Sequence, residues 1–69
     1  MYARTFHKAH QTRRLIITSL ETNGWEVRDE QDTQVLRLVH YTDWHRVERA
    51  RMAFAELAMR LEHAGWVES

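Results

Sequence analysis

Both glycines of the sequence occur in one repeated hexapeptide, "LETNGW" at residues 20–25 and "LEHAGW" at residues 61–66. A glycine directly after a helix adopts the left-handed conformation easily, and the next residue commonly packs back onto the residue five positions earlier. That rule pairs Trp25 with Leu20 and Trp66 with Leu61. The repeat therefore predicts two helix ends, one before Gly24 and the other before Gly65.

Residues 5–23 have apolar spacing that favours the first helix. At 100° per residue, one arc of about 100° contains Phe6, Ala9, Ile16, Ile17 and Leu20. Arg13 falls inside this arc, and Leu15 lies on the opposite, polar face. Because a buried arginine is costly unless it is paired, we expect Arg13 either to pair with a glutamate such as Glu48 across a dimer or to contact a partner protein.

The second predicted helix runs from Trp44 to Ala64, and Thr42 or Asp43 can cap its start. Its main apolar stripe consists of Val47, Ala50, Phe54, Leu57, Ala58 and Leu61. A second stripe on another face holds Trp44, Met52, Ala55 and Met59. One stripe can serve the core and the other a second protomer or a different partner, and the pattern does not decide between them.

Between the two helices, β-branched and aromatic residues favour a hairpin with strands Trp25–Arg28 and Gln34–Tyr41 and an acidic loop between them. The loop has no glycine, and residues 35–39 would also suit a helix, so an all-α chain is the alternative. The predicted fold is one α+β domain of residues 1–69 with an αββα layout.

The length of 69 residues and the absence of cysteine favour a homodimer. A domain of this size buries only about 60% of the surface that its unfolded chain exposes, and no disulfide is available to stabilise it. We therefore expect a second copy to complete the core. The predicted core and dimer residues are Phe6, Ile17, Leu20, Trp25, Val47, Phe54, Leu57, Leu61 and Trp66.

Catalytic and metal-binding patterns are weak in this sequence. Neither serine lies in a nucleophile turn, and the histidine spacing matches no zinc finger. "LETNGWEV" before a hairpin resembles the opening of HicA-type ribonuclease toxins, but "TQVLRLVHY" replaces their glycine-serine-histidine motif and leaves only His40 as a counterpart. We expect no enzymatic activity, metal or cofactor.

The net charge is zero, but the charges are distributed unevenly. Residues 1–20 carry four basic residues and no acid, whereas residues 21–34 carry five acids and one arginine. A basic segment can neutralise phosphates. A nucleic-acid-binding regulator that uses Arg4, Lys8 and Arg14 is therefore the alternative function.

Aromatic residues and arginine often dominate the binding energy of protein interfaces. "HYTDWHR" offers such a group, in which Trp44 is either a core residue or a contact residue. The acids of the predicted loop could in turn mimic phosphates. The predicted partner-binding residues are Arg13, Tyr41, Trp44, Arg46, Arg51, Asp29, Glu30 and Asp32.

In length, lack of cysteine, arginine-rich composition and predicted layout, the chain resembles small host-takeover proteins of temperate phages, in particular the phage quorum-sensing anti-activator family. The resemblance implies a dimeric inhibitor that binds the DNA-binding domain of a LuxR-type transcription activator and also a pilus-assembly ATPase. We therefore predict a non-enzymatic inhibitor or adaptor of host proteins. The N-terminus lacks the apolar core of a signal peptide, which predicts the bacterial host cytoplasm as its location.

Overall fold

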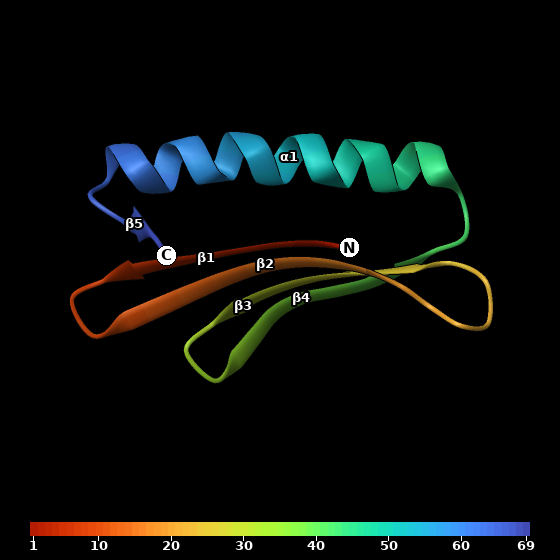
Figure 1. Cartoon of the computed structure of the whole chain (residues 1–69), viewed down its shortest axis with the longest axis horizontal. Coiled ribbons are helices and arrows are strands. Elements are labelled where there is room, and N and C mark those ends of the chain that lie inside the picture. The colour runs from red at the N-terminus through yellow and green to blue at the C-terminus, as the bar shows by residue number, and fades with distance from the viewer.

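The computed structural model describes residues 1–69 and shows a five-stranded antiparallel sheet with one helix packed along one of its faces (Figure 1). The strand order is β4-β3-β2-β1-β5, so the first four strands form a meander and β5 joins β1 after the helix. The elements are β1 Tyr2–Lys8, β2 Gln11–Ser19, β3 Trp25–Gln31, β4 Gln34–Tyr41, α1 Trp44–His63 and β5 Val67–Glu68.

The predicted αββα layout is wrong, as is the all-α alternative, because residues 5–23 are not a helix. They belong to the hairpin β1–β2, in which Phe6 lies opposite Arg13 and Arg4 lies opposite Leu15. Side chains alternate between the faces of a strand, so Phe6 and Leu15 both point towards α1 and are fully buried. Leu15, which the helical spacing placed on a polar face, is in the centre of the core.

The first copy of the hexapeptide is not a helix cap. Gly24 has a φ of +121° in the loop between β2 and β3, where its carbonyl oxygen accepts a hydrogen bond from the Leu20 N–H at 2.9 Å. Trp25 begins β3, opposite Ser19 on β2 and Tyr41 on β4. Leu20 is half-buried in this loop and does not belong to the core cluster.

The second copy of the hexapeptide does end a helix, as predicted. The Trp66 N–H donates to the Leu61 carbonyl oxygen at 2.9 Å, and the Gly65 N–H donates to that of Glu62 at 3.1 Å. With a φ of +96° at Gly65, these bonds form a Schellman cap. At the other end of α1, the Asp43 side chain accepts a hydrogen bond from the His45 N–H at 2.9 Å, which confirms an N-cap there.

The predicted hairpin of residues 25–41 is present, but its first strand is longer than expected. β3 extends to Gln31, so Asp29 and Glu30 lie within a strand and only Asp32 and Thr33 form the turn. The register shifts by one residue beside Asp29 and Glu30. This irregularity places Val35 opposite Glu30 and Leu38 opposite Arg28, on the sheet face that α1 does not cover.

The core lies between α1 and the covered face of the sheet. Five of the predicted core residues are buried in it. Trp25, Leu57 and Trp66 are partly buried and pack against its margin. Each turn of α1 contributes one or two small or apolar side chains, in agreement with the predicted main stripe. The buried set is Phe6, Leu15, Ile17, Val27, Val47, Ala50, Phe54, Ala58 and Leu61.

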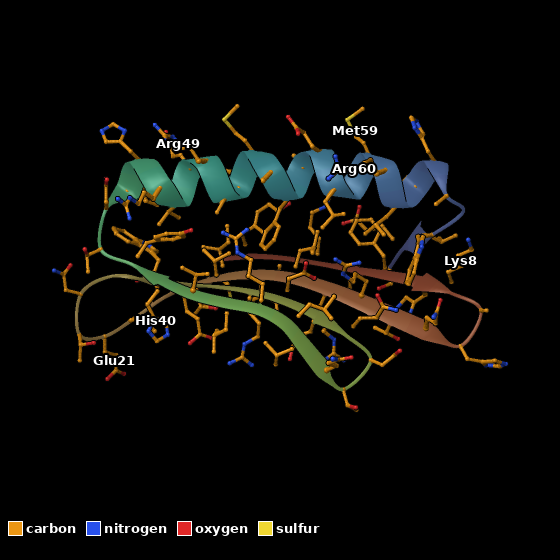
Figure 2. All side chains as sticks on the ribbon, turned by 180° about the vertical axis from the view of Figure 1, so that it is seen from behind. Lys8, Glu21, His40, Arg49, Met59 and Arg60 are labelled. Atoms are coloured by element: carbon orange, nitrogen blue, oxygen red, sulfur yellow. The ribbon has the colours of Figure 1, made fainter.

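The other face of the sheet carries charged and polar side chains beside the exposed Val35 and Leu38. Arg28 lies 3.0 Å from a Glu26 carboxylate oxygen and 3.7 Å from one of Glu30, and His40 lies 3.2 Å from Glu26. Figure 2 shows His40 on this open face and Met59 pointing away from the sheet on the outer side of α1. An antiparallel sheet with one solvated face suits such alternation.

The pairing of β2 with β3 neutralises the uneven charge within the chain. It brings the basic N-terminal segment next to the acidic one, with Arg13 beside Asp29 and Arg14 opposite Glu30. Arg13 donates two hydrogen bonds to the Asp29 carboxylate, at 2.7 and 2.8 Å, and these bonds raise the pKa of Arg13. The predicted pair of Arg13 with Glu48 across a dimer is therefore not required.

Candidate protein-binding surface

β4 is the outermost strand on one side of the sheet, and its outer edge pairs with no other strand. Val35, Leu36 and Leu38 on this strand are 46%, 46% and 49% exposed. An exposed edge strand with apolar side chains is a template for pairing with another chain. β4 contains no proline and a single charged residue, Arg37, so little in its sequence blocks such pairing.

A groove of about 440 Å³ runs between β4 and α1. Arg37 and Tyr41 line it from the strand, and Arg37 donates a hydrogen bond to the Tyr41 hydroxyl oxygen at 3.2 Å. Arg46 and Arg49 line it from the helix, and two alanines leave room between them. None of the three arginines forms an ion pair with a carboxylate of the chain. We call Arg37, Arg46, Arg49 and Tyr41 the arginine groove.

The predicted partner-binding residues separate into three groups. Tyr41 and Arg46 lie in the arginine groove, as a contact role requires. Trp44 and Arg51 line a different cavity. The acids and Arg13 are engaged within the chain: Arg13 with Asp29, Glu30 with Arg28, and Asp32 through its side chain with the Thr12 N–H at 3.0 Å. The acidic loop expected to mimic phosphates is therefore not present as a loop.

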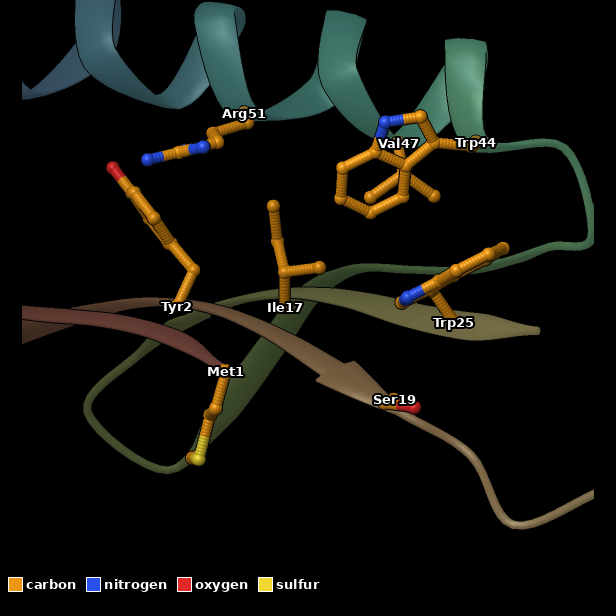
Figure 3. A pocket seen from close by; sticks show the side chains of 8 residues that line it. All are labelled: Met1, Tyr2, Ile17, Ser19, Trp25, Trp44, Val47 and Arg51. Carbon is orange, nitrogen blue, oxygen red and sulfur yellow. The ribbon is translucent and has the colours of Figure 1, made fainter. Parts of the chain in front are cut away.

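The second cavity, of about 230 Å³, lies between the start of α1 and the sheet (Figure 3). The rings of Trp25 and Trp44 lie 5.2 Å apart at an angle of 54°. In Figure 3, Ile17 stands on the sheet between Trp25 and Tyr2, and Val47 lies on the helix beside Trp44. Trp44 is half-exposed and packs on Trp25 at the margin of the core, and its role as a partner contact stays a prediction. We call this space the aromatic cavity.

The residues of the nucleic-acid alternative do not share a basic helix, because that helix is absent. Arg4 donates two hydrogen bonds to the Glu68 carboxylate, at 2.8 and 2.7 Å, and lies 3.6 Å from Glu62. Lys8 donates to the Ala64 carbonyl oxygen at 2.6 Å, beneath the C-terminal end of α1. Arg14 lies on the open face. Two of the three charges are thus engaged within the chain.

The Arg4–Glu68 contact predicts a pH dependence of stability. The hydrogen bond from Arg4 lowers the pKa of Glu68 below the ordinary glutamate value. A carboxyl with a lowered folded-state pKa adds stability above its unfolded-state pKa and loses it as the pH falls through the folded-state value. We expect Glu68→Gln to lower the melting temperature at neutral pH and to leave it unchanged in strong acid. An equal difference at both pH values, measured by circular dichroism, would contradict this prediction.

Arg49 and Arg37 of the arginine groove were not among the predicted partner-binding residues, and for Arg37 the sequence contains a signal. The available signal was strand alternation, because residues 37, 39 and 41 of a strand point to the same side. That pattern places the Arg37 guanidinium on the side of Tyr41 and α1. The apolar residues on both sides of Arg37 indicate apolar strand faces and give no sign of a basic groove.

No significant match was found among protein-family models, curated proteins or solved structures. The structure itself brings together no group of three or more side chains suited to hold a metal ion. The helix α1 does not contain a long enough apolar stretch to cross a membrane.

Proposed function

We propose that this chain is a stoichiometric protein-binding inhibitor or adaptor that accepts an extended, acidic segment of its partner along the edge of β4. One observation carries the proposal: an unpaired edge strand lies beside three arginines that have no carboxylate partner in the chain. Strand addition to a sheet edge is a common mode of peptide recognition, in which main-chain hydrogen bonds give affinity and side-chain contacts give specificity.

The geometry of a strand allows the unpaired β4 edge and the arginine groove to bind the same segment of a partner. A strand added to β4 would lie about 4.8 Å away, and its alternate side chains would point to opposite faces. Those on the side of α1 would meet the arginine groove, where carboxylates can form charge-assisted hydrogen bonds with the guanidinium groups. Those on the open face would meet Val35 and Leu38. An alternation of acidic and apolar residues is the pattern that fits.

Charge disfavours a second copy of this chain as the added strand. Two β4 strands paired antiparallel are related by a two-fold axis perpendicular to the sheet, so both arginine grooves would lie on the same side of the junction. Three arginines from each copy would then approach one another, and like charges across a junction are unfavourable. The predicted homodimer would instead use the outer face of α1 with Met52 and Met59, and sedimentation of the free protein tests it.

The proposal includes the host-takeover function. The layout on which the resemblance partly rested is not that of the structure, although the length and composition are unchanged. A LuxR-type transcription activator and a pilus-assembly ATPase in a bacterial cytoplasm are therefore candidate targets for a direct test. They are not required by the β4 edge.

The experiment compares tagged variants as baits in a bacterial lysate treated with nuclease. Arg46→Gln/Arg49→Gln removes two charges from the groove, and Arg51→Gln/Arg60→Gln removes two charges from the same helix outside it. We expect the first variant to lose the discrete partner that the wild type and the second variant retain. With purified partner, we expect Kd to rise at least about tenfold. That change corresponds to a loss of about 1.4 kcal/mol of binding free energy.

The edge strand is tested separately. Leu38→Lys places a charge on the exposed edge, and Met59→Lys places the same charge on the outer face of α1. Loss of the partner with Leu38→Lys alone supports strand addition. Equal loss with both groove and control variants, or capture of nucleic acid alone that disappears as salt rises, would contradict the proposed function.

A further inference from the structure

We propose that the aromatic cavity binds a small planar aromatic carboxylate. This site is separate from the β4 edge and does not depend on the proposed function. Its eight lining residues come from the N-terminal strand, the end of β2, the start of β3 and the first two turns of α1. At about 230 Å³ it is smaller than typical drug-binding pockets of about 300–1,000 Å³, so it suits one fused ring system and not a long ligand.

The apolar part of the cavity favours an aromatic ligand. Trp25 and Trp44 form one wall with rings tilted by 54°, and Tyr2 forms the opposite wall, where it stacks on Phe54 at 6.1 Å. Aromatic rings prefer offset-stacked and tilted arrangements at such separations. A planar ring that enters the cavity would meet Tyr2 at one end and the two tryptophans at the other, with Ile17 from β2 and Val47 from α1 as further apolar contacts.

The polar part of the cavity favours a carboxylate. The Tyr2 hydroxyl is buried and forms no hydrogen bond in the structure, although it lies close enough to the Arg4 guanidinium to contribute to the raised pKa of Arg4. Arg51 lies 5.9 Å from the centroid of the Tyr2 ring and forms no ion pair with a carboxylate of the chain. Figure 3 shows the Tyr2 hydroxyl directed towards the Arg51 side chain, at the end of the cavity away from the tryptophans.

A buried polar group without a partner is unusual in a native protein. A ligand carboxylate at this end of the cavity could accept a hydrogen bond from the Tyr2 hydroxyl and an ionic one from Arg51. The ring of the same ligand would then lie against Trp25 and Trp44. The separation of the two kinds of lining, positive at one end and aromatic at the other, is what selects an aromatic acid over a neutral ring or a simple anion.

The three tryptophans provide the readout for a test. Their indole N–H groups give separate signals in an ¹⁵N-correlated NMR spectrum, and only Trp25 and Trp44 line the cavity. Trp66 lies at the far end of α1 and serves as an internal control. The probe is 2-naphthoate, and its neutral counterpart is 2-naphthamide, which has the same ring and no charge.

We expect 2-naphthoate to cause saturable shifts of the Trp25 and Trp44 signals and none of the Trp66 signal. Arg51→Gln should weaken binding at least about tenfold, whereas Arg60→Gln, which removes the same charge from the same helix outside the cavity, should leave it unchanged. Both arginines are exposed, and the spectrum itself reports whether each variant is folded. 2-Naphthamide should bind as weakly to the wild type as 2-naphthoate does to Arg51→Gln.

Three results would overturn the proposal. One is the absence of saturable shifts at millimolar 2-naphthoate. The second is equal binding of the acid and the amide, which would indicate a general apolar pocket. The third is an equal effect of Arg51→Gln and Arg60→Gln, which would mean that net charge and not the position of Arg51 governs binding.

Discussion

Gly24→Ala is expected to destabilise this domain by about 3 kcal/mol or more. A Cβ atom at this position would lie 2.8 Å from the backbone oxygen of Tyr41, closer than such atoms approach in folded proteins. The φ of +121° adds backbone strain of about 1–3 kcal/mol for any residue other than glycine. The backbone cannot easily move away, because the neighbouring Trp25 is paired with Tyr41 in the β3–β4 ladder.

Gly65→Ala is the matched control for this prediction. Its φ of +96° also disfavours alanine, but a Cβ atom there would meet only the flexible Lys8 side chain, at 3.7 Å. We expect a loss of about 1 kcal/mol, at the lower end of the cost of such backbone strain. In a domain of this size 1 kcal/mol shifts the melting temperature by about 4–8 °C, so thermal unfolding separates the two variants. Equal shifts would show that strain dominates and that the close approach to Tyr41 is relieved by a small movement.

Asp29→Ala is expected to destabilise the domain by about 3 kcal/mol. The Arg13 and Asp29 side chains are only 15% and 12% exposed, and two short hydrogen bonds join them on the covered side of the sheet. Removal of the carboxylate leaves a guanidinium with little access to water, and an unpaired buried charge typically costs about 3–5 kcal/mol. The partial exposure of Arg13 places our value at the lower end of that range.

The double variant Arg13→Met/Asp29→Leu separates loss of pairing from loss of packing. It removes both charges and replaces them with apolar side chains of similar length or volume, an exchange that is often neutral or stabilising. We expect its free energy of unfolding, from urea titration, to exceed that of Asp29→Ala. A double variant that is less stable than Asp29→Ala would show that the pair contributes more than mutual neutralisation.

The missing first helix shows why local spacing was misleading in residues 5–23. The turn between β1 and β2 consists of Ala9 and His10, and Ala9 adopts a φ of +54° although it is not glycine or asparagine. Without the usual turn residues, the two strands looked like one continuous amphipathic segment. Two residues disagreed with the helix, Arg13 and Leu15. Both are explained by a strand, in which residues 13, 15 and 17 share one face.

The second half of the chain was more predictable because its signals agree with one another. Asp43 caps the helix, one apolar stripe faces the sheet, and Gly65 ends the last turn. The strands β3 and β4 followed from their β-branched residues, but the register shift near Glu30 has no glycine or other local signature. Strict alternation along β4 would place Val35 and Leu38 on opposite faces, whereas the structure places them on the same one.

The candidate sites were only partly predictable, since each combines segments that are distant in sequence. Tyr41 and Arg46 are close to each other along the chain, and both were predicted as contacts. Tyr2 and Arg51 come together only because β1 lies beneath the helix, and a chain that began with a helix would not place them so. The aromatic cavity thus depends on the part of the fold that the sequence did not reveal.

The meander of the first four strands also has a consequence for how the protein folds. Each of these strands pairs with its neighbour in sequence, across loops of two, five and two residues, and short loops close at little entropic cost. Contacts that are local in sequence favour rapid folding. We expect the hairpins to form first and α1 to dock onto them afterwards. Substitutions of Phe54 should then mainly accelerate unfolding, and changes at the Gly24 loop should slow the formation of the sheet.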